Sequence, residues 1–132
     1  IVHMKRDARA ICWSIYSIYL KHVDFGNDFE DITGFYSLYT ELMDFWQQLF
    51  PGKIYDLCYE DLTTNQEEET RKLLQYCELD WDDNCLSFHN NKRTVNTACS
   101  LQVKKKMYQG SSEAWKKYEA YLKPLIKALD SY

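Results

Sequence analysis

The chain contains little glycine and proline and no long apolar segment. Its 132 residues include 4 Gly and 2 Pro, which excludes long flexible linkers, and no repeat at solenoid spacing is present. The apolar runs are short and interrupted by charge, so none matches a membrane span of about 20 residues. Hydrophobic residues make up 45% of the chain and aromatic residues 16%, enough to fill a core. The composition therefore predicts one continuous folded domain.

The chain also lacks an excess of basic residues. It has 16 Lys and Arg against 20 Asp and Glu, which gives a formal net charge of −4. Domains that bind nucleic acids through a general surface usually carry a strong positive balance. We therefore expect no nucleic-acid partner and no membrane contact in this segment, and any anion site must be local.

The cysteines show no metal-binding pattern. Their number is odd, and none forms a CxxC pair or a Cys/His spacing typical of zinc sites; they are Cys12, Cys58, Cys77, Cys85 and Cys99. We therefore predict no metal site and a reducing compartment. Because Cys77 and Cys85 flank a short loop, a disulfide between them is the alternative to two free thiols.

The first residues combine a strand end, a helix start and a cation. Residues 1–4 are apolar enough for a strand, Arg6 follows it, and Asp7 can cap a helix that begins with Ala8. Ligands of open α/β sheets bind outside such strand ends, where helix N-termini offer free N–H groups. Arg6 and Ser14, two turns along the helix, are thus candidates for phosphate binding. In the alternative, Arg6 pairs with a nearby carboxylate and Ser14 faces a neighbouring residue of its helix.

Hydrophobic periodicity predicts the elements of the first half. We expect a helix over about residues 7–21 and an exposed connection over residues 24–34 that borders a site. A strongly amphipathic helix over residues 35–49 follows and ends at Pro51-Gly52. We expect its apolar stripe to be core; the stripe consists of Phe35, Leu38, Tyr39, Leu42, Phe45, Trp46 and Leu49.

The second half begins with another strand, over residues 53–59. The segment Thr64-Asn65-Gln66-Glu67 has the form of a capping box, and a helix over residues 66–77 should bury Leu73, Leu74 and Cys77. A short helical turn around residues 85–88 and a final helix over residues 112–129, bent at Pro124, complete the chain. The element order predicts parallel strands in an α/β fold. Two strands make a poor sheet, so we expect further strands upstream of residue 1.

Several separated motifs are similar to the sulfotransferase superfamily. Arg6 and Ser14 keep the spacing of the superfamily's 3′-phosphate motif, and residues 59–62 match its "Y-E-D-L" strand end. Residues 97–104 (TACSLQVK) and 115–119 (WKKYE) resemble a loop and a closing helix of the bacterial and tyrosylprotein-sulfotransferase-like branch. Two departures stand out: Cys99 replaces the usual loop serine, and Ala114 replaces a basic residue before the tryptophan.

The resemblance implies a fold, a donor and a set of contacts. The fold would be the C-terminal portion of a P-loop-like sulfotransferase fold, helix-rich, with few parallel strands flanked by helices. Residues 1–132 would form a single partial domain without the N-terminal phosphosulfate-binding loop. The donor would be 3′-phosphoadenosine 5′-phosphosulfate (PAPS), or its product PAP. Its implied contacts are Arg6 and Ser14 at the 3′-phosphate, Tyr59 near the adenine, and Ser100 and Lys104 in the late loop.

The implied activity is transfer of a sulfuryl group to an acceptor hydroxyl or amine. We expect the 132-residue chain alone to be inactive, and we assign no catalytic base, since His3 and His89 suit structural roles. The acceptor and the oligomeric state stay open, and a bacterial cytoplasm is expected over a Golgi lumen. The alternatives are a kinase-like phosphotransferase, which lacks a Walker loop here, and a non-catalytic helical interaction module. The latter would expose Phe45 and Trp46.

Overall fold

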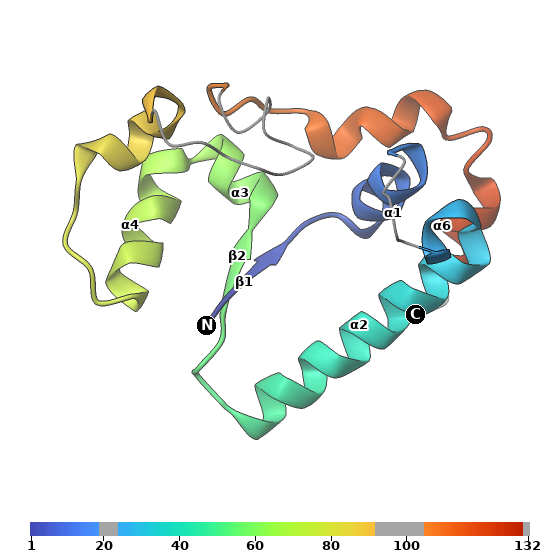
Figure 1. The fold of residues 1–132 in the computed structure, drawn as a ribbon, viewed down its shortest axis with the longest axis horizontal. Helices are drawn as coiled ribbons and strands as arrows, with labels where there is room; N and C mark the ends of the chain where they lie inside the picture. Colours follow the sequence, from blue (N-terminus) through green and yellow to red (C-terminus); the bar gives the residue numbers. More distant parts are fainter. Residues whose placement is uncertain (19–23, 92–104, 131–132) are drawn as a thin grey trace.

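The computed structural model describes residues 1–18, 24–91 and 105–130 (Figure 1). Two short strands lie at the centre, with helices on either side and the long helix α2 running diagonally beneath them. Three of the helices, named η, are 3-10 helices. In chain order the elements are β1 (Val2–Lys5), α1 (Ala8–Ser17), η1 (Asp24–Asn27), α2 (Phe29–Leu49), β2 (Tyr55–Cys58), α3 (Tyr59–Thr64), α4 (Gln66–Tyr76), η2 (Asp83–Asn90), η3 (Ser111–Tyr118) and α6 (Lys123–Leu129).

The two strands pair in parallel, as the element order predicted. Val2 lies opposite Tyr55 and Lys5 lies opposite Cys58. Both strands therefore end at the same edge of the sheet, where α1 and α3 begin. A parallel pair needs a long crossover connection, and α2 is its longest element. The predicted α/β arrangement of few parallel strands flanked by helices is thus present in the described residues.

The core lies beside the sheet, between α1, α2, η3 and α6. Its buried members form one cluster: Ala10, Cys12, Ile32, Trp115, Leu122 and Leu125. Leu57 of β2 is also buried. The cluster joins the first third of the chain to its last, so η3 is held against α1 at the strand ends.

The predicted connection over residues 24–34 is mostly helical. Asp28 caps α2, because its side chain accepts hydrogen bonds from the backbone N–H groups of Glu30 and Asp31. Ile32 and Thr33 are consequently placed in the core, with only 1% and 2% of their surfaces exposed. The prediction of an exposed loop was wrong because the N-cap outweighed the two glycines on which it was based.

Three helix boundaries also differ from the expectations. Helix α1 ends at Ser17, since the backbone of Ile18 is extended. The final helix is broken into η3 and α6, with Pro124 in the first turn of α6. The capping box is wrong, because Thr64 belongs to α3, an unpredicted helix, and donates to the carbonyl of Glu60.

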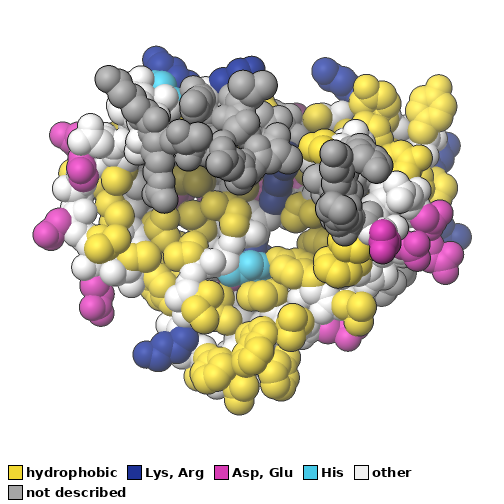
Figure 2. Space-filling model, viewed as in Figure 1, with side chains coloured by type: hydrophobic (Ala, Val, Ile, Leu, Met, Phe, Trp, Pro, Cys, Tyr) yellow, Lys and Arg dark blue, Asp and Glu magenta, His cyan; other side chains and the backbone are white. Residues whose placement is uncertain are grey.

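The predicted apolar stripe of α2 is largely exposed. Phe35, Leu38, Leu42, Phe45, Trp46 and Leu49 are all exposed, and Tyr39 alone among the stripe's seven residues is half-buried. The buried apolar residue of this helix is Ile32, which precedes the stripe. Figure 2 shows hydrophobic side chains gathered at the lower tip of the molecule, over the end of α2. The expectation that this stripe is core was therefore wrong.

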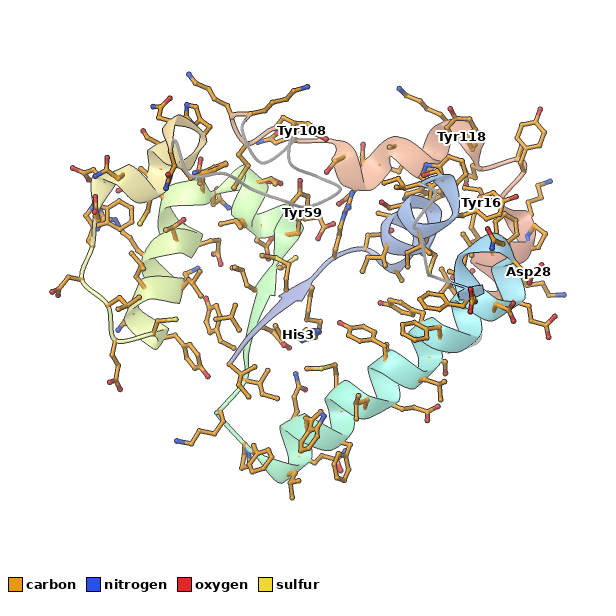
Figure 3. All side chains as sticks on the ribbon, viewed as in Figure 1. His3, Tyr16, Asp28, Tyr59, Tyr108 and Tyr118 are labelled. Carbon is orange, nitrogen blue, oxygen red and sulfur yellow. The ribbon has the colours of Figure 1, made fainter. Side chains whose placement is uncertain are left out.

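A chain of side-chain contacts joins the sheet to α2. His3 of β1 contacts Asp56 of β2 through Nδ1, at 2.7 Å, and the Tyr39 hydroxyl of α2 through Nε2. Gln47 of α2 donates to the other oxygen of Asp56 at 3.0 Å. His3 thus links β1, β2 and α2. In Figure 3 it lies between the strands and α2.

Buried and exposed apolar residues of α2 should differ in their contributions to stability. Ile32→Ala should lower the free energy of unfolding by about 2–5 kcal/mol, because it leaves a cavity in the core. Leu38→Ala, on the same helix but largely exposed, should change it by no more than about 0.5 kcal/mol. Urea unfolding followed by circular dichroism checks both values. Equal losses would contradict the placement of the core.

Asp56 should make stability depend on pH. Burial raises its pKa, but hydrogen bonds from His3 and Gln47 and the charge of Lys5 outweigh burial, so its pKa lies below the usual value. A carboxylate with a lowered folded pKa stabilises the fold above its unfolded pKa of about 3.9 and loses that contribution as the pH falls through the folded pKa. Asp56→Asn should therefore flatten the loss of stability below about pH 4. Thermal unfolding from pH 7 to pH 2 tests this, with Asp44→Asn as the control.

Candidate functional site

A pocket lies at the edge of the sheet where both strands end. Its volume is about 450 Å³, within the usual range of small-ligand sites. Figure 3 shows Tyr59 and Tyr108 beyond the strand ends, on the opposite side of the strands from His3. Four segments line the pocket: the end of β1, helix α1, the start of α3, and the stretch that leads into η3. Its lining residues are Arg6, Ala10, Trp13, Ser14, Ser17, Ile18, Tyr59, Tyr108, Gln109, Gly110, Ser111 and Ala114.

Arg6 is held by its neighbours without an ion pair. Its Nε donates to the Ser112 hydroxyl at 3.0 Å, and its guanidinium lies 5.0 Å from the centre of the Tyr59 ring. Among the described residues, no carboxylate lies within ion-pair distance of Arg6, and its two terminal nitrogens have no hydrogen-bond partner. The predicted alternative, a pairing of Arg6 with a nearby carboxylate, is therefore not found in this part of the chain. The free edge of the guanidinium suits a phosphate oxygen pair.

Helix α1 supplies the hydroxyls of the pocket. Asp7 caps α1 as predicted, since its carboxylate accepts from the backbone N–H of Ala10 at 2.9 Å. Ser14 lines the pocket together with Arg6, and Ser17 lies one turn further along. The spacing of eight residues between Arg6 and Ser14 thus brings both side chains to one cavity. A ligand in it would meet a cation and a hydroxyl from a single strand-helix unit.

Tyr59 connects the pocket to the C-terminal part of the chain. It is the first residue of α3, and its phenolic oxygen accepts a hydrogen bond from the Ser111 hydroxyl at 3.0 Å. The chain turns into η3 at Gly110, whose φ of +89° is strained for any other residue. The sequence prediction included Tyr59 but missed Gly110, Ser111 and Ser112. A glycine followed by two serines before a helix was the available signal.

Glu60 is a second group that the sequence prediction missed. Its carboxylate accepts a hydrogen bond from the backbone N–H of Asp7 at 3.2 Å. Burial raises the pKa of Glu60, but hydrogen bonds from Ser112 and from the backbone outweigh burial, so its pKa lies below the usual value. Glu60 is therefore ionised at neutral pH, next to the turn that carries Arg6.

Ser100 and Lys104, the other two predicted donor contacts, lie outside the described residues. Cys77 is exposed, and it and Cys85 are free thiols, so the disulfide alternative and the predicted burial of Cys77 were wrong. In the described ranges, no group of three His, Cys, Asp or Glu side chains converges as metal ligands would.

The helices can also be compared with the dimensions of a lipid bilayer. No helix of the described ranges combines the length and the apolar character needed to cross a membrane.

Fold and pocket together define an α/β protein with an arginine-containing pocket at the carboxyl ends of parallel strands. A family model described as the sulfotransferase family matches residues 1–83, which is more than half of the chain. The chain belongs to the sulfotransferase family.

One relative extends the match to nearly the whole chain. An uncharacterized protein from Aquifex aeolicus (strain VF5) is 39% identical to this chain over 133 residues. The alignment covers 98% of the chain and 18% of the Aquifex protein, so the chain spans less than a fifth of that relative's length.

Proposed function

We propose that this chain contributes the 3′-phosphate and adenine side of a PAPS site, and that the intact enzyme transfers the sulfuryl group to an acceptor hydroxyl or amine. One observation carries the proposal: Arg6, Ser14 and Tyr59, chosen from sequence motifs 8 and 45 residues apart, line one pocket. The family match supports the class of reaction. The motifs at residues 97–104 and 115–119 favour the bacterial and tyrosylprotein-like branch.

Each lining group has a definite task in this proposal. The terminal nitrogens of Arg6 donate to the 3′-phosphate, and the Ser14 hydroxyl adds a further donor. The Tyr59 ring packs against the adenine. The contact of the Arg6 guanidinium with that ring fixes the phosphate-binding side chain relative to the adenine-binding one. Ser100 and Lys104 remain proposed donors from the late loop. No metal ligand is required by this set.

The bound donor supplies an activated sulfuryl group, and the protein's task is then mainly positioning. Transfer of this kind depends on holding the donor and the acceptor in line and on stabilising charge on the leaving phosphate. The residues described here fix the nucleotide end of the donor. The groups that act on the sulfuryl end and on the acceptor are not among the residues that we assign, so we expect the 132-residue chain to bind PAP without catalysing transfer.

Binding of PAP tests the proposal directly. Isothermal titration calorimetry of the full-length protein should show tighter binding of PAP than of 5′-AMP, which lacks the 3′-phosphate. Arg6→Ala should weaken PAP binding at least about tenfold, because it removes charge-assisted hydrogen bonds, and should change 5′-AMP binding little.

A matched control separates local contacts from net charge. Arg71→Ala removes the same charge from α4, where Arg71 pairs with Glu67, outside the pocket lining. It should leave both affinities unchanged. A wild-type protein that binds PAP no better than 5′-AMP would refute the donor assignment.

A second candidate function is favoured by the exposed half of α2. The interaction-module alternative required Phe45 and Trp46 to be accessible, and they are 53% and 37% exposed. Monomeric soluble proteins rarely expose large contiguous apolar patches, so such a patch indicates an interaction surface. In this alternative the sulfotransferase-like core carries a protein-binding helix and no donor.

Self-association of the chain tests whether the exposed apolar face of α2 binds a second copy. Sedimentation velocity over a hundredfold range of concentration should show association of the wild-type chain, and the double change Leu42→Glu and Phe45→Glu should abolish it, since charges at an apolar interface are costly to desolvate. Ser37→Glu, on the same helix, serves as the control. If the wild-type chain stays monomeric, the face does not bind a second copy, and the interaction-module alternative loses its support.

A further inference from the structure

We infer that Glu60 is a positioning residue for Arg6: it fixes the turn that presents the guanidinium to the pocket. This inference rests on the proposed function, because it explains how the proposed 3′-phosphate contact is held in place. Glu60 is not among the residues that line the pocket. Its effect on a ligand would therefore pass through Arg6.

The backbone contact is the first argument. The N–H group that Glu60 accepts, at 3.2 Å, belongs to Asp7 and is part of the peptide unit that joins Arg6 to Asp7. A hydrogen bond to this unit fixes the plane of the peptide directly after the Arg6 Cα atom. Such a backbone N–H at a helix start has no partner within the helix, so an external acceptor is needed.

The side-chain contact is the second argument. Ser112 accepts from Arg6 Nε at 3.0 Å, and the same side chain helps to lower the pKa of the Glu60 carboxylate. A serine hydroxyl has one proton, and a carboxylate can only accept. Because the Ser112 oxygen accepts from Arg6, its single proton is available to Glu60. Glu60 thus contacts the backbone next to Arg6 directly, and Ser112 links it to the guanidinium.

The contacts join segments that are far apart in the chain. Arg6 lies at the end of β1, Glu60 in the first turn of α3, and Ser112 in η3. The three segments meet at the mouth of the pocket, and Cys58 completes the environment of Glu60 with an Sγ to Oε2 contact of 3.3 Å. Each carboxylate oxygen of Glu60 therefore accepts one contact, Oε1 from the Asp7 backbone and Oε2 from the Cys58 thiol.

A negative charge near an anion site also allows an opposite effect. If Glu60 acted only as a charge, it would repel the 3′-phosphate, and its removal would tighten PAP binding. If it positions Arg6, its removal weakens PAP binding. The two interpretations therefore predict changes of opposite sign.

The experiment compares the affinities for PAP and 5′-AMP by calorimetry of the full-length protein. Glu60→Ala should lower the ratio of the two affinities about tenfold, and Glu60→Gln, which keeps one acceptor, by less. Ser112→Ala should lower the ratio, and Ser112→Thr, which restores the hydroxyl, should recover it. The ratio is unaffected by a fraction of unfolded protein, because that fraction lowers both apparent affinities equally.

Two controls make the outcome specific. Glu67→Ala removes the same charge from exposed α4 and should not change the ratio. In an Arg6→Ala background, Glu60→Ala should have no further effect, since a positioning residue acts only through the group that it positions.

Each outcome has a separate meaning. A wild-type protein without preference for PAP refutes the proposed donor site and with it this inference. A wild-type protein that prefers PAP and loses the preference in Arg6→Ala, while Glu60→Ala binds PAP equally or more tightly, refutes the positioning role alone.

Discussion

The parallel pairing of β1 with β2 is the constraint on which the rest of the structure depends. Its register places Lys5 opposite Cys58, so the next residues, Arg6 and Tyr59, leave the sheet at the same edge. An antiparallel pair would have sent them to opposite ends. The short strands contribute little buried area themselves, and the pairing is held from outside by the contacts of His3 and Asp56 with α2. The pocket is thus a consequence of strand direction.

The sequence was sufficient for the parts of the site that depend on local signals. Arg6, Asp7 and Ser14 follow from a strand end, a cap and a helical spacing, and Tyr59 follows from the second strand end once the strands are taken as parallel. Ser112 and Glu60 could not be predicted in this way. Their partners are 106 and 53 residues away in the chain, and no local pattern encodes such a contact. Ser100 and Lys104 remain predictions.

Helix α2 shows a different limit of prediction. A periodic apolar stripe identifies the side of a helix that can be buried, but it does not say what covers it. Ile32 packs with residues of α1 and α6 and is buried, whereas Leu38 and Phe45 lie outside the core cluster and are exposed. The helix start was missed for the converse reason: Asp28 formed a strong cap in a segment whose glycines indicated a loop. The glycines of this segment indicate a loop, but the Asp28 cap determines where α2 begins.

The charge arrangement bears on how an acidic chain would hold the anion that we propose. With a net charge of −4, the chain offers no general attraction, so a phosphate must be bound by local donors. A carboxylate in direct contact with Arg6 would fix the guanidinium but occupy the nitrogens that a ligand needs. Here the hydroxyl of Ser112 takes only Nε, and the Glu60 carboxylate accepts from the backbone N–H of Asp7 without forming an ion pair with Arg6. This arrangement separates orientation from neutralisation: Arg6 lines the pocket, and among the described residues its two terminal nitrogens make no hydrogen bond or ion pair.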